Sequence, residues 1–252
     1  MKNLIQLDDY PTGPPENAKK RAIQKETKKL TKEIGRLQKL LYADRRYAVL
    51  VIFQGVDATG KDSSTRSVFH YCSPMATWAY GFVKPTKIEM DHDFLWRVHK
   101  VAPRKGKIRI FNRSHYEDIL IQRVEKWIDM ERVEMRMDAI NAFEKLLRDD
   151  NNTLILKFYM HISKERQGEK LQRRIEDPSR RWKHDDADWI VREKWDDYMD
   201  AYHYILNNSD IPWMIVPCDR KWYRNYFIAK KVYEAMNDLD LRIPKIFSIG
   251  NG

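Results

Sequence analysis

The sequence predicts an α/β fold in which a five-stranded parallel sheet is sandwiched by helices. Five apolar, β-branched or aromatic runs alternate with long segments of helical periodicity, and the runs are 47–54, Thr77–Val83, Lys107–Asn112, Thr153–His161 and Ile211–Cys218. The stretches Ala48–Phe53 and Leu154–Phe158 are apolar almost throughout, as strands buried on both faces are. A length of 252 residues is compatible with one large domain, so we expect residues 1–252 to form a single unit.

The first 45 residues are expected to form an irregular leader and one helix. Residues 1–15 are rich in proline and glycine, which disfavour regular structure. The segment Asn17–Tyr42 carries apolar residues at helical spacing among charges of both signs, and these are Ile23, Leu30, Ile34, Leu37, Leu40 and Leu41. This pattern predicts an amphipathic helix that packs on the protein or contacts another copy, and the mixed charges disfavour a membrane-surface role.

The overall charge points to a polyanionic partner. Lys and Arg number 47 against 37 Asp and Glu, which gives a net charge of +10. Nucleic acid, anionic lipid and inorganic phosphate polymers all satisfy this balance. The two cysteines, Cys72 and Cys218, show no metal-binding spacing, and the sequence shows neither a signal-peptide pattern nor a membrane-spanning apolar run. We therefore expect a cytoplasmic protein without a membrane partner.

The first strand leads directly into a phosphate-binding loop. The stretch 55–62 reads G-V-D-A-T-G-K-D and nearly fits the P-loop pattern G-x-x-x-x-G-K-[ST], in which backbone N–H groups and a lysine cradle phosphate oxygens. Lys61 is the expected phosphate-binding lysine, and the alternative is a glycine-containing turn without catalytic use. The expected phosphate contacts of the loop and the following helix come from Gly55, Ala58, Thr59, Gly60 and Ser63.

Two carboxylates distinguish this loop from the usual pattern. Asp62 stands where a magnesium-binding Ser or Thr is expected, and Asp57 lies inside the loop. Bare carboxylates repel phosphate, so a polyanion needs a divalent metal or further cations here. Asp57 and Asp62 are therefore the candidate metal ligands, with Mg²⁺ as the expected ion and Mn²⁺ as an alternative. The alternative for Asp62 is a first-turn carboxylate that stabilises its helix, and both roles can coexist.

A second group of candidates follows the third strand. In parallel sheets the ligand lies beyond the carboxyl ends of the strands, and the run at 111–118 reads F-N-R-S-H-Y-E-D. Asn112 replaces the magnesium-holding aspartate of other P-loop enzymes, and Glu117 is a further acid nearby. The planar guanidinium of Arg113 can bind two phosphate oxygens at once. A salt bridge with Glu117 is as consistent with the spacing. His115 is expected to be structural.

The segment 163–190 is expected to form a lid. Seven cations surround the turn Asp177-Pro178-Ser179, and they are Arg166, Lys170, Arg173, Arg174, Arg180, Arg181 and Lys183. Such runs are usually solvated helix faces, and interspersed glutamates fit that interpretation in part. A flap that closes on phosphates and excludes water is the functional alternative, with Arg166, Arg173, Arg174 and Lys183 as its phosphate contacts. An aromatic, acidic helix is expected to follow over 185–206.

A second basic tract follows the second strand. It includes Lys84, Lys87, Arg97, Lys100 and Arg104, with Phe94 and Trp96 interleaved. Nucleic-acid binding is the competing interpretation, because aromatic side chains can stack on bases. Beside a P-loop, we interpret the tract as a channel for a phosphate polymer and expect no nucleic-acid partner.

Taken together, the motifs resemble the polyphosphate kinase 2 family. The loop at 55–62, the junction at 111–118, R-R-W-K-H-D-D-A-D-W at 180–189 and W-D-D-Y at 195–198 carry the resemblance, which spans about residues 17–240. It implies a thymidylate-kinase-like P-loop kinase fold with a helical lid, and Mg²⁺-dependent phosphoryl transfer between inorganic polyphosphate and nucleotides. It also implies that Asp57, Lys61 and Asp62 are Walker A residues and that Arg113 and Glu117 belong to the second motif.

The resemblance also implies finer properties. Many family members have Asp at the position of Asn112, and the version found here is similar to the subgroup that uses both nucleoside mono- and diphosphates, with AMP, ADP, GMP and GDP as expected acceptors. A homodimer or homotetramer is implied as well. The alternatives are an ATP-dependent nucleoside monophosphate kinase and a non-enzymatic P-loop module that binds nucleic acid.

Overall fold

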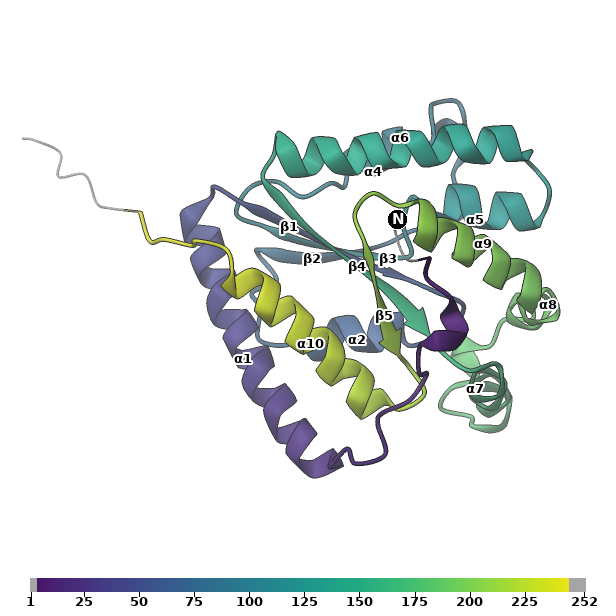
Figure 1. The fold of residues 1–252 in the computed structure, drawn as a ribbon, viewed down its shortest axis with the longest axis horizontal. Coiled ribbons are helices and arrows are strands. Elements are labelled where there is room, and N and C mark those ends of the chain that lie inside the picture. The colour runs from purple at the N-terminus through teal and green to yellow at the C-terminus, as the bar shows by residue number, and fades with distance from the viewer. Residues whose placement is uncertain (1–3, 245–252) are drawn as a thin grey trace, which may run out of the picture.

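The structure is a computed structural model that describes residues 4–244. The predicted leader begins before this range, and the predicted single unit 1–252 extends beyond both ends of it. The regular elements, in chain order, are a 3₁₀ helix η1 (Leu7–Asp9), α1 (Lys20–Asp44), β1 (Ala48–Gln54), α2 (Lys61–Val68), β2 (Thr77–Gly81), α3 (Lys87–Met90), α4 (Trp96–His99), β3 (Ile108–Asn112), α5 (Glu117–Val124), α6 (Met130–Asp149), β4 (Thr153–His161), α7 (Lys164–Glu176), a 3₁₀ helix η2 (Arg181–Lys183), α8 (Ala187–Glu193), α9 (Trp195–Asn208), β5 (Trp213–Pro217) and α10 (Lys221–Asn237) (Figure 1).

The five strands form one parallel sheet in the order β2-β3-β1-β4-β5. This arrangement confirms the predicted sheet, although β2 and β5 are shorter than the runs that predicted them. Every residue of the central strand β1 is buried, as its continuous apolar sequence requires. The carboxyl ends of β1 and β3 lie side by side, because Phe53 pairs with Asn112. The loops after these two strands therefore meet at one edge of the sheet.

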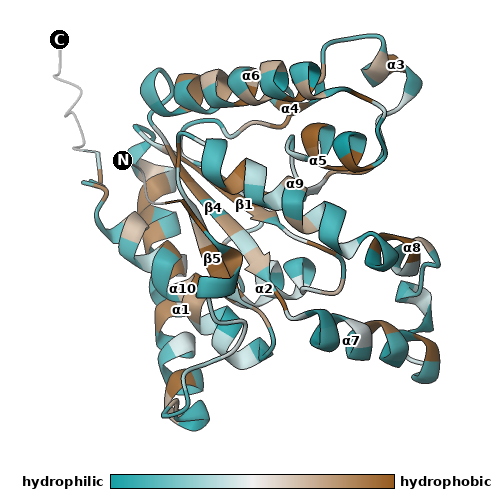
Figure 2. Cartoon of the chain, turned by 45° about the vertical axis from the view of Figure 1, so that its right-hand side comes forward, coloured by the Kyte–Doolittle hydropathy of each residue, from teal (hydrophilic) through white to brown (hydrophobic). Residues whose placement is uncertain are grey.

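Helices cover both faces of the sheet. Helices α1, α2 and α10 lie on one face, and α5, α6 and α9 lie on the other (Figure 1). Apolar residues gather on the central strands between these two helical layers, while α7 is largely hydrophilic (Figure 2). The lid segment, α7 through α8, projects beyond the carboxyl edge of the sheet. The predicted sandwich and the predicted position of the basic segment are thus both observed.

The N-terminal amphipathic helix is used for packing within the chain. Ile34, Leu37 and Leu41 of α1 are buried in the main core, and α1 packs against α10. Burying these side chains leaves the charged face of α1 in solvent, as the sequence pattern predicts. None of the helices in residues 4–244 is long and apolar enough to cross a membrane.

The helix predicted over 185–206 is interrupted. Lys194 separates α8 from α9, because its backbone leaves the helical region at φ −90° and ψ 26°. Its side chain instead forms an ion pair with Glu125, the residue that follows α5, at 2.6 Å. The prediction of one continuous helix was therefore wrong at this point, since apolar periodicity carries no signal for a break of one residue.

Candidate active site

The loop between β1 and α2 has the backbone geometry of a phosphate cradle. Gly60 has φ +99°, and Ala58 also lies in the left-handed region at φ +64°. A Cβ on Gly60 would lie 2.0 Å from Nη1 of Arg224, so any other residue would displace that guanidinium. Helix α2 begins at the next residue. Its unpaired N–H groups and its dipole therefore face the loop, where an anion would be stabilised.

Lys61 is buried against this loop. Its Nζ donates to the carbonyl oxygens of Gly55 at 2.7 Å and Val56 at 3.1 Å, and lies 3.9 Å from Oδ1 of Asp57. Burial lowers the pKa of Lys61, whereas the charge of Asp57 acts in the opposite direction. The side chain is thus held against the first residues of the loop, beside the carboxylate of Asp57.

Asp57 and Arg113 form a close ion pair across the two loops. Nη2 of Arg113 donates to Oδ1 of Asp57 at 2.7 Å and to Oδ2 at 2.8 Å. Burial alone would raise the pKa of Asp57, but the charges of Lys61 and Arg113 outweigh it and lower the pKa to about 2. Arg113 itself has φ +60°, a strained conformation that places it beside the loop.

This pairing excludes one of the two interpretations of Arg113 that the sequence left open. The alternative salt bridge with Glu117 is not formed, because the guanidinium turns toward Asp57. Glu117 accepts instead from Nε2 of Gln54 at 2.5 Å, and Gln54 also accepts from Ser114 at 3.0 Å. Glu117 therefore lies at the base of the site, fixed by the last residue of β1.

Asp62 and Asn112 meet at the mouth of the site. Asp62 lies in the first turn of α2 and is exposed, and the side-chain amide of Asn112 donates to it. Within residues 4–244, no group of three or more His, Cys, Asp or Glu side chains is arranged to hold a metal. Mg²⁺, however, is commonly bound by one or two carboxylates together with substrate phosphates. The carboxylates of Asp57 and Asp62 and the amide oxygen of Asn112 fit such a partial site.

The segment predicted as a lid, 163–190, contacts the P-loop through α7. Gln167 of α7 donates to the backbone oxygen of Asp57 at 3.5 Å and accepts from Nη1 of Arg192 at 2.9 Å. Arg174 forms an ion pair with Asp188 of α8. Burial, and then repulsion by Asp57, raise the pKa of Asp188 to about 6. The two lid helices are therefore held together directly over the P-loop.

The four predicted lid contacts divide into two groups. Arg166 and Arg174 are ion-paired, with Glu169 and Asp188 respectively. Arg173 and Lys183 are exposed and form no ion pair with any described residue. The charges of these two predicted contacts, like that of the equally exposed Arg181, are therefore not neutralised by an ion pair within residues 4–244.

The predicted polymer channel after β2 is only partly consistent with the structure. Lys84, Lys87, Lys100 and Arg104 are exposed. Arg97 is only 7% exposed, donates to the carbonyl of Val83 at 2.8 Å and pairs with Asp118 at 3.1 Å. Its guanidinium is used inside the protein, so Arg97 is removed from the channel and assigned to holding the segment after β2.

Sequence reasoning missed Arg224, which supports the cradle from behind. Arg224 lies on α10, is buried, and donates to the carbonyl of Thr59 at 2.8 Å and to Oγ of Ser63 at 2.7 Å. It fixes both ends of the G-K-D turn without reaching the solvent. No motif or spacing in the sequence marks Arg224, because it stands more than 160 residues from the loop.

The fold and the site define a P-loop kinase, with a phosphate cradle, a buried lysine, two carboxylates and a basic helical lid at the carboxyl edge of a parallel sheet. The family model described as polyphosphate kinase 2 matches residues 17–243. The chain is 39% identical over 219 residues to an AMP/ADP-polyphosphate phosphotransferase of Meiothermus ruber. These aligned residues cover 86% of this chain and 82% of that protein. The chain belongs to the polyphosphate kinase 2 family.

Two further comparisons agree with this assignment. An ADP-polyphosphate phosphotransferase of Rhodopseudomonas palustris is 39% identical over 224 residues, which cover 83% of this chain and 77% of that protein. The crystal structure of polyphosphate kinase 2 from Arthrobacter aurescens superposes with a TM-score of 0.93 at 33% identity, covering 97% of this chain and 90% of that one. The predicted P-loop kinase fold is thereby confirmed.

Proposed function

We propose that this protein transfers phosphoryl groups between inorganic polyphosphate and purine nucleotides, and that it uses both nucleoside monophosphates and diphosphates. Membership of the polyphosphate kinase 2 family and the similarity to an AMP/ADP-polyphosphate phosphotransferase support the reaction. The acceptors expected are AMP, ADP, GMP and GDP. The location we propose is the cytoplasm, where nucleotides are found.

The observation that carries this proposal is the state of Asp57. A kinase that phosphorylates an alcohol needs a base whose pKa lies near the working pH. The pKa of Asp57 is held at about 2, and both its oxygens accept from Arg113, so it is a poor proton acceptor. A phosphate acceptor is already an anion at neutral pH and needs cations to approach a second polyanion. The cation-rich site therefore favours phosphate as the acceptor.

Each group at the site has a role in this reaction. Lys61 binds the phosphoryl group in transfer, and Arg113 neutralises charge that develops on it. Arg173 and Lys183 bring further positive charge when the lid, 163–190, closes and excludes water. Arg166 and Arg174 orient the lid, and Glu117 positions Gln54 beneath the loop. The backbone from Gly55 to Gly60 cradles the phosphate oxygens.

Mg²⁺, or Mn²⁺ in its place, would be held by Asp57 and Asp62 with help from Asn112. When bound, the ion neutralises phosphate charge and orients the oxygens of both substrates. Asp62 also favours the N-terminus of α2 electrostatically, so both roles that the sequence allowed for it are compatible.

We also propose that the protein forms a homodimer or homotetramer through the free edge of the sheet. Strand β2 is an edge strand, and Trp78 on it is 61% exposed. Val83, Ile88 and Met90 in the following segment are 75%, 67% and 61% exposed. Exposed large apolar side chains on an edge strand and in the segment that follows it are typical of an interface. Trp78→Glu should shift the mass in light scattering to that of a monomer, and an unchanged mass would exclude this edge.

The reaction is tested by supplying the protein with Mg²⁺, long-chain polyphosphate and one nucleotide at a time. We expect ATP from ADP, ADP and ATP from AMP, and the corresponding products from GMP and GDP. A parallel reaction replaces polyphosphate by ATP as the donor to AMP. Transfer from ATP without transfer from polyphosphate would replace this proposal with a nucleoside monophosphate kinase. Binding of DNA or RNA without turnover would indicate the nucleic-acid module instead.

A further inference from the structure

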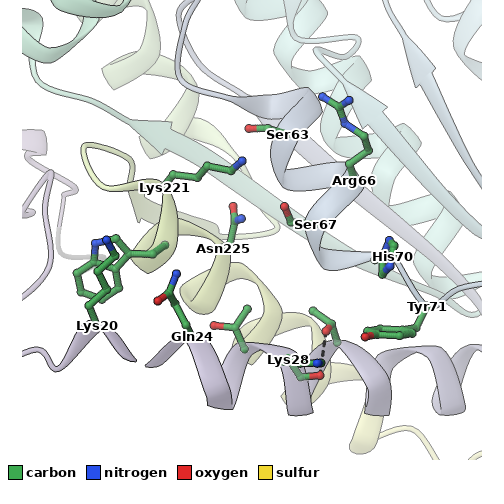
Figure 3. Close-up of a pocket in the computed structure, with 13 residues that line it drawn as sticks. Lys20, Gln24, Lys28, Ser63, Arg66, Ser67, His70, Tyr71, Lys221 and Asn225 are labelled. Atoms are coloured by element: carbon green, nitrogen blue, oxygen red, sulfur yellow. Dashed lines mark hydrogen bonds between the residues drawn. The ribbon is translucent and has the colours of Figure 1, made fainter. Parts of the chain in front are cut away.

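A large pocket lies on the helical face of the molecule that carries α1, α2 and α10. Its volume is about 900 Å³, and three helices supply its walls (Figure 3). Its lining includes Lys20 and Lys28 of α1, Ser63 and Arg66 of α2, and Lys221 of α10. None of the residues predicted to bind phosphate polymer after β2 lines it. The pocket is therefore distinct from the predicted polymer channel, and among the predicted phosphate contacts only Ser63 lines it.

The charge of the pocket is of one sign. Lys20 and Lys28 come from α1, Arg66 from α2 and Lys221 from α10, and none of the lining residues is acidic. These four side chains are exposed and form no ion pair with any residue in 4–244. Unpaired like charges around one cavity repel one another and attract a polyanion into it.

The walls of the pocket are fixed by the fold. Helix α1 approaches the turn after α2 so closely that a Cβ on Gly35 would lie 2.6 Å from the carbonyl oxygen of Tyr71. Gln38 of α1 also accepts from the backbone N–H of Ser73 at 2.9 Å. The cations are thus carried on backbone that is already in place, which lowers the entropic cost of binding a ligand.

The pocket adjoins the phosphate cradle at Ser63. Ser63 lines the pocket, donates to the carbonyl of Gly60 at 3.0 Å and accepts from Arg224 at 2.7 Å. Figure 3 shows that Ser63, Arg66 and Ser67 all come from α2, the helix that begins at the P-loop. A linear polyanion that occupies the P-loop can therefore continue along α2 into the pocket.

We infer that this pocket binds the part of the polyphosphate chain that extends beyond the P-loop. The inference rests on the proposed function, because it concerns the donor of that reaction. A phosphate polymer carries charge along its whole length and matches cations spread over three helices. A nucleotide concentrates its charge at one end and would leave cations on the other walls unpaired. The polyphosphate thus extends from the cradle toward α1 and α10, away from the lid.

The test compares two triple variants that remove the same charge. The pocket variant is Lys20→Gln, Lys28→Gln and Lys221→Gln, and the control is Lys25→Gln, Lys29→Gln and Lys39→Gln. The control residues are exposed on α1 and do not line the pocket. Steady-state kinetics are measured with long-chain polyphosphate and with tripolyphosphate, which is long enough for the cradle alone. Where tripolyphosphate turns over too slowly, its inhibition constant is measured instead.

We expect the pocket variant to raise KM for long-chain polyphosphate about tenfold, because three exposed ion pairs each contribute a few-fold. The kcat, the KM for ADP and the KM or inhibition constant for tripolyphosphate should stay within about twofold of the values of the unmodified protein. All kinetic constants of the control variant should stay within the same range. Equal changes with both polymers, or equal changes in both triple variants, would overturn the inference. So would a rise in KM that follows substitution of Lys84, Lys87 and Arg104 instead.

Failure of this inference is distinguishable from failure of the proposed function. If the unmodified protein transfers phosphate from polyphosphate but the pocket variant is normal, the pocket assignment alone is wrong. If the unmodified protein shows no transfer from polyphosphate of any length, both statements are wrong. Thermal melting of the two variants confirms that the substitutions leave the fold intact.

Discussion

The guanidinium of Arg113 donates to both carboxylate oxygens of Asp57, at 2.7 and 2.8 Å. The two residues stand on different loops, after β3 and β1, which the parallel pairing of these strands brings together. The contact keeps Asp57 ionised, and it places a planar cation beside the P-loop before any substrate arrives. The active site is therefore electrostatically organised by an interaction between its two motifs.

Arg113→Lys should lower kcat by about a hundredfold or more, because the forked guanidinium that neutralises the transferring phosphoryl group is lost. KM for nucleotide should change little, since the interaction is made chiefly in the transition state. Arg148→Lys is the matched control, because Arg148 is exposed and pairs only with its neighbour Asp149. A kcat within about fivefold of the unmodified enzyme would remove Arg113 from the mechanism.

Gly60→Ala should abolish turnover while the protein remains folded. A Cβ here would lie 2.0 Å from Nη1 of Arg224, and the φ of +99° is itself unfavourable for alanine. Gly81→Ala is the control, since no atom lies within 4 Å of the corresponding Cβ. Turnover and circular dichroism are measured on both. Normal activity of Gly60→Ala would show that the Arg224 support of the loop is dispensable.

Lys157→Met should destabilise the fold by about 3–5 kcal/mol, because it leaves a buried carboxylate without its cation. Lys157 donates to Glu144 at 2.7 Å and to the hydroxyl of Tyr116 at 2.6 Å, and all three side chains are inaccessible to solvent. Burial opposes ionisation of Glu144, but Lys157 and His115 together outweigh it and lower the pKa.

The free energy of unfolding is measured by denaturant titration. Lys157→Met combined with Glu144→Gln should recover part of the loss, since no uncompensated charge remains. Lys145 is exposed and follows Glu144 on α6, so Lys145→Met is the control and should change the free energy of unfolding by less than about 0.5 kcal/mol. Equal losses in the single and double variants would argue against an ion pair as the cause.

Lys170→Met should raise the melting temperature near pH 7 and lose this advantage as the pH rises. Burial, and then repulsion by Arg224, lower the pKa of Lys170 to about 8. An unfolded lysine titrates near pH ~10.4, so between these values the unfolded chain binds more protons than the folded one. Stability from this group therefore increases with pH in that window.

Thermal melting at steps from pH 7 to pH 10 compares Lys170→Met with the unmodified protein. The difference in melting temperature should be largest at pH 7 and shrink above pH 8. A difference that stays constant over the range would mean that Lys170 is not shifted.

The sequence was sufficient to predict the fold and the position of the site, because both follow from local patterns. Apolar runs predicted the parallel sheet, and its carboxyl edge located the loops that carry Lys61 and Arg113. The ion-pair partner of Arg113 could not be predicted from the sequence. Arg113 had Glu117 at helical spacing and Asp57 more than fifty residues away, and only the register of β1 on β3 decides between them.

Burial was the other property that sequence pattern could not supply. Arg97 lies only three residues before the exposed Lys100 in the same basic tract, yet it faces inward and pairs with Asp118. Arg224 supports the P-loop from a helix with no phosphate-binding motif. The basic pocket depends on three helices that meet only in the folded chain, so its cations appeared in the sequence as scattered surface charge.

The central claim is that polyphosphate donates its phosphoryl group at the site of Lys61. It is tested most directly by incubating radiolabelled polyphosphate with ADP and Mg²⁺ and measuring label in the terminal phosphate of ATP. We predict rapid labelling by the unmodified protein and a loss of several orders of magnitude in Lys61→Ala, whose fold is checked by thermal melting. Unlabelled ATP, or equal labelling by Lys61→Ala, would contradict the account.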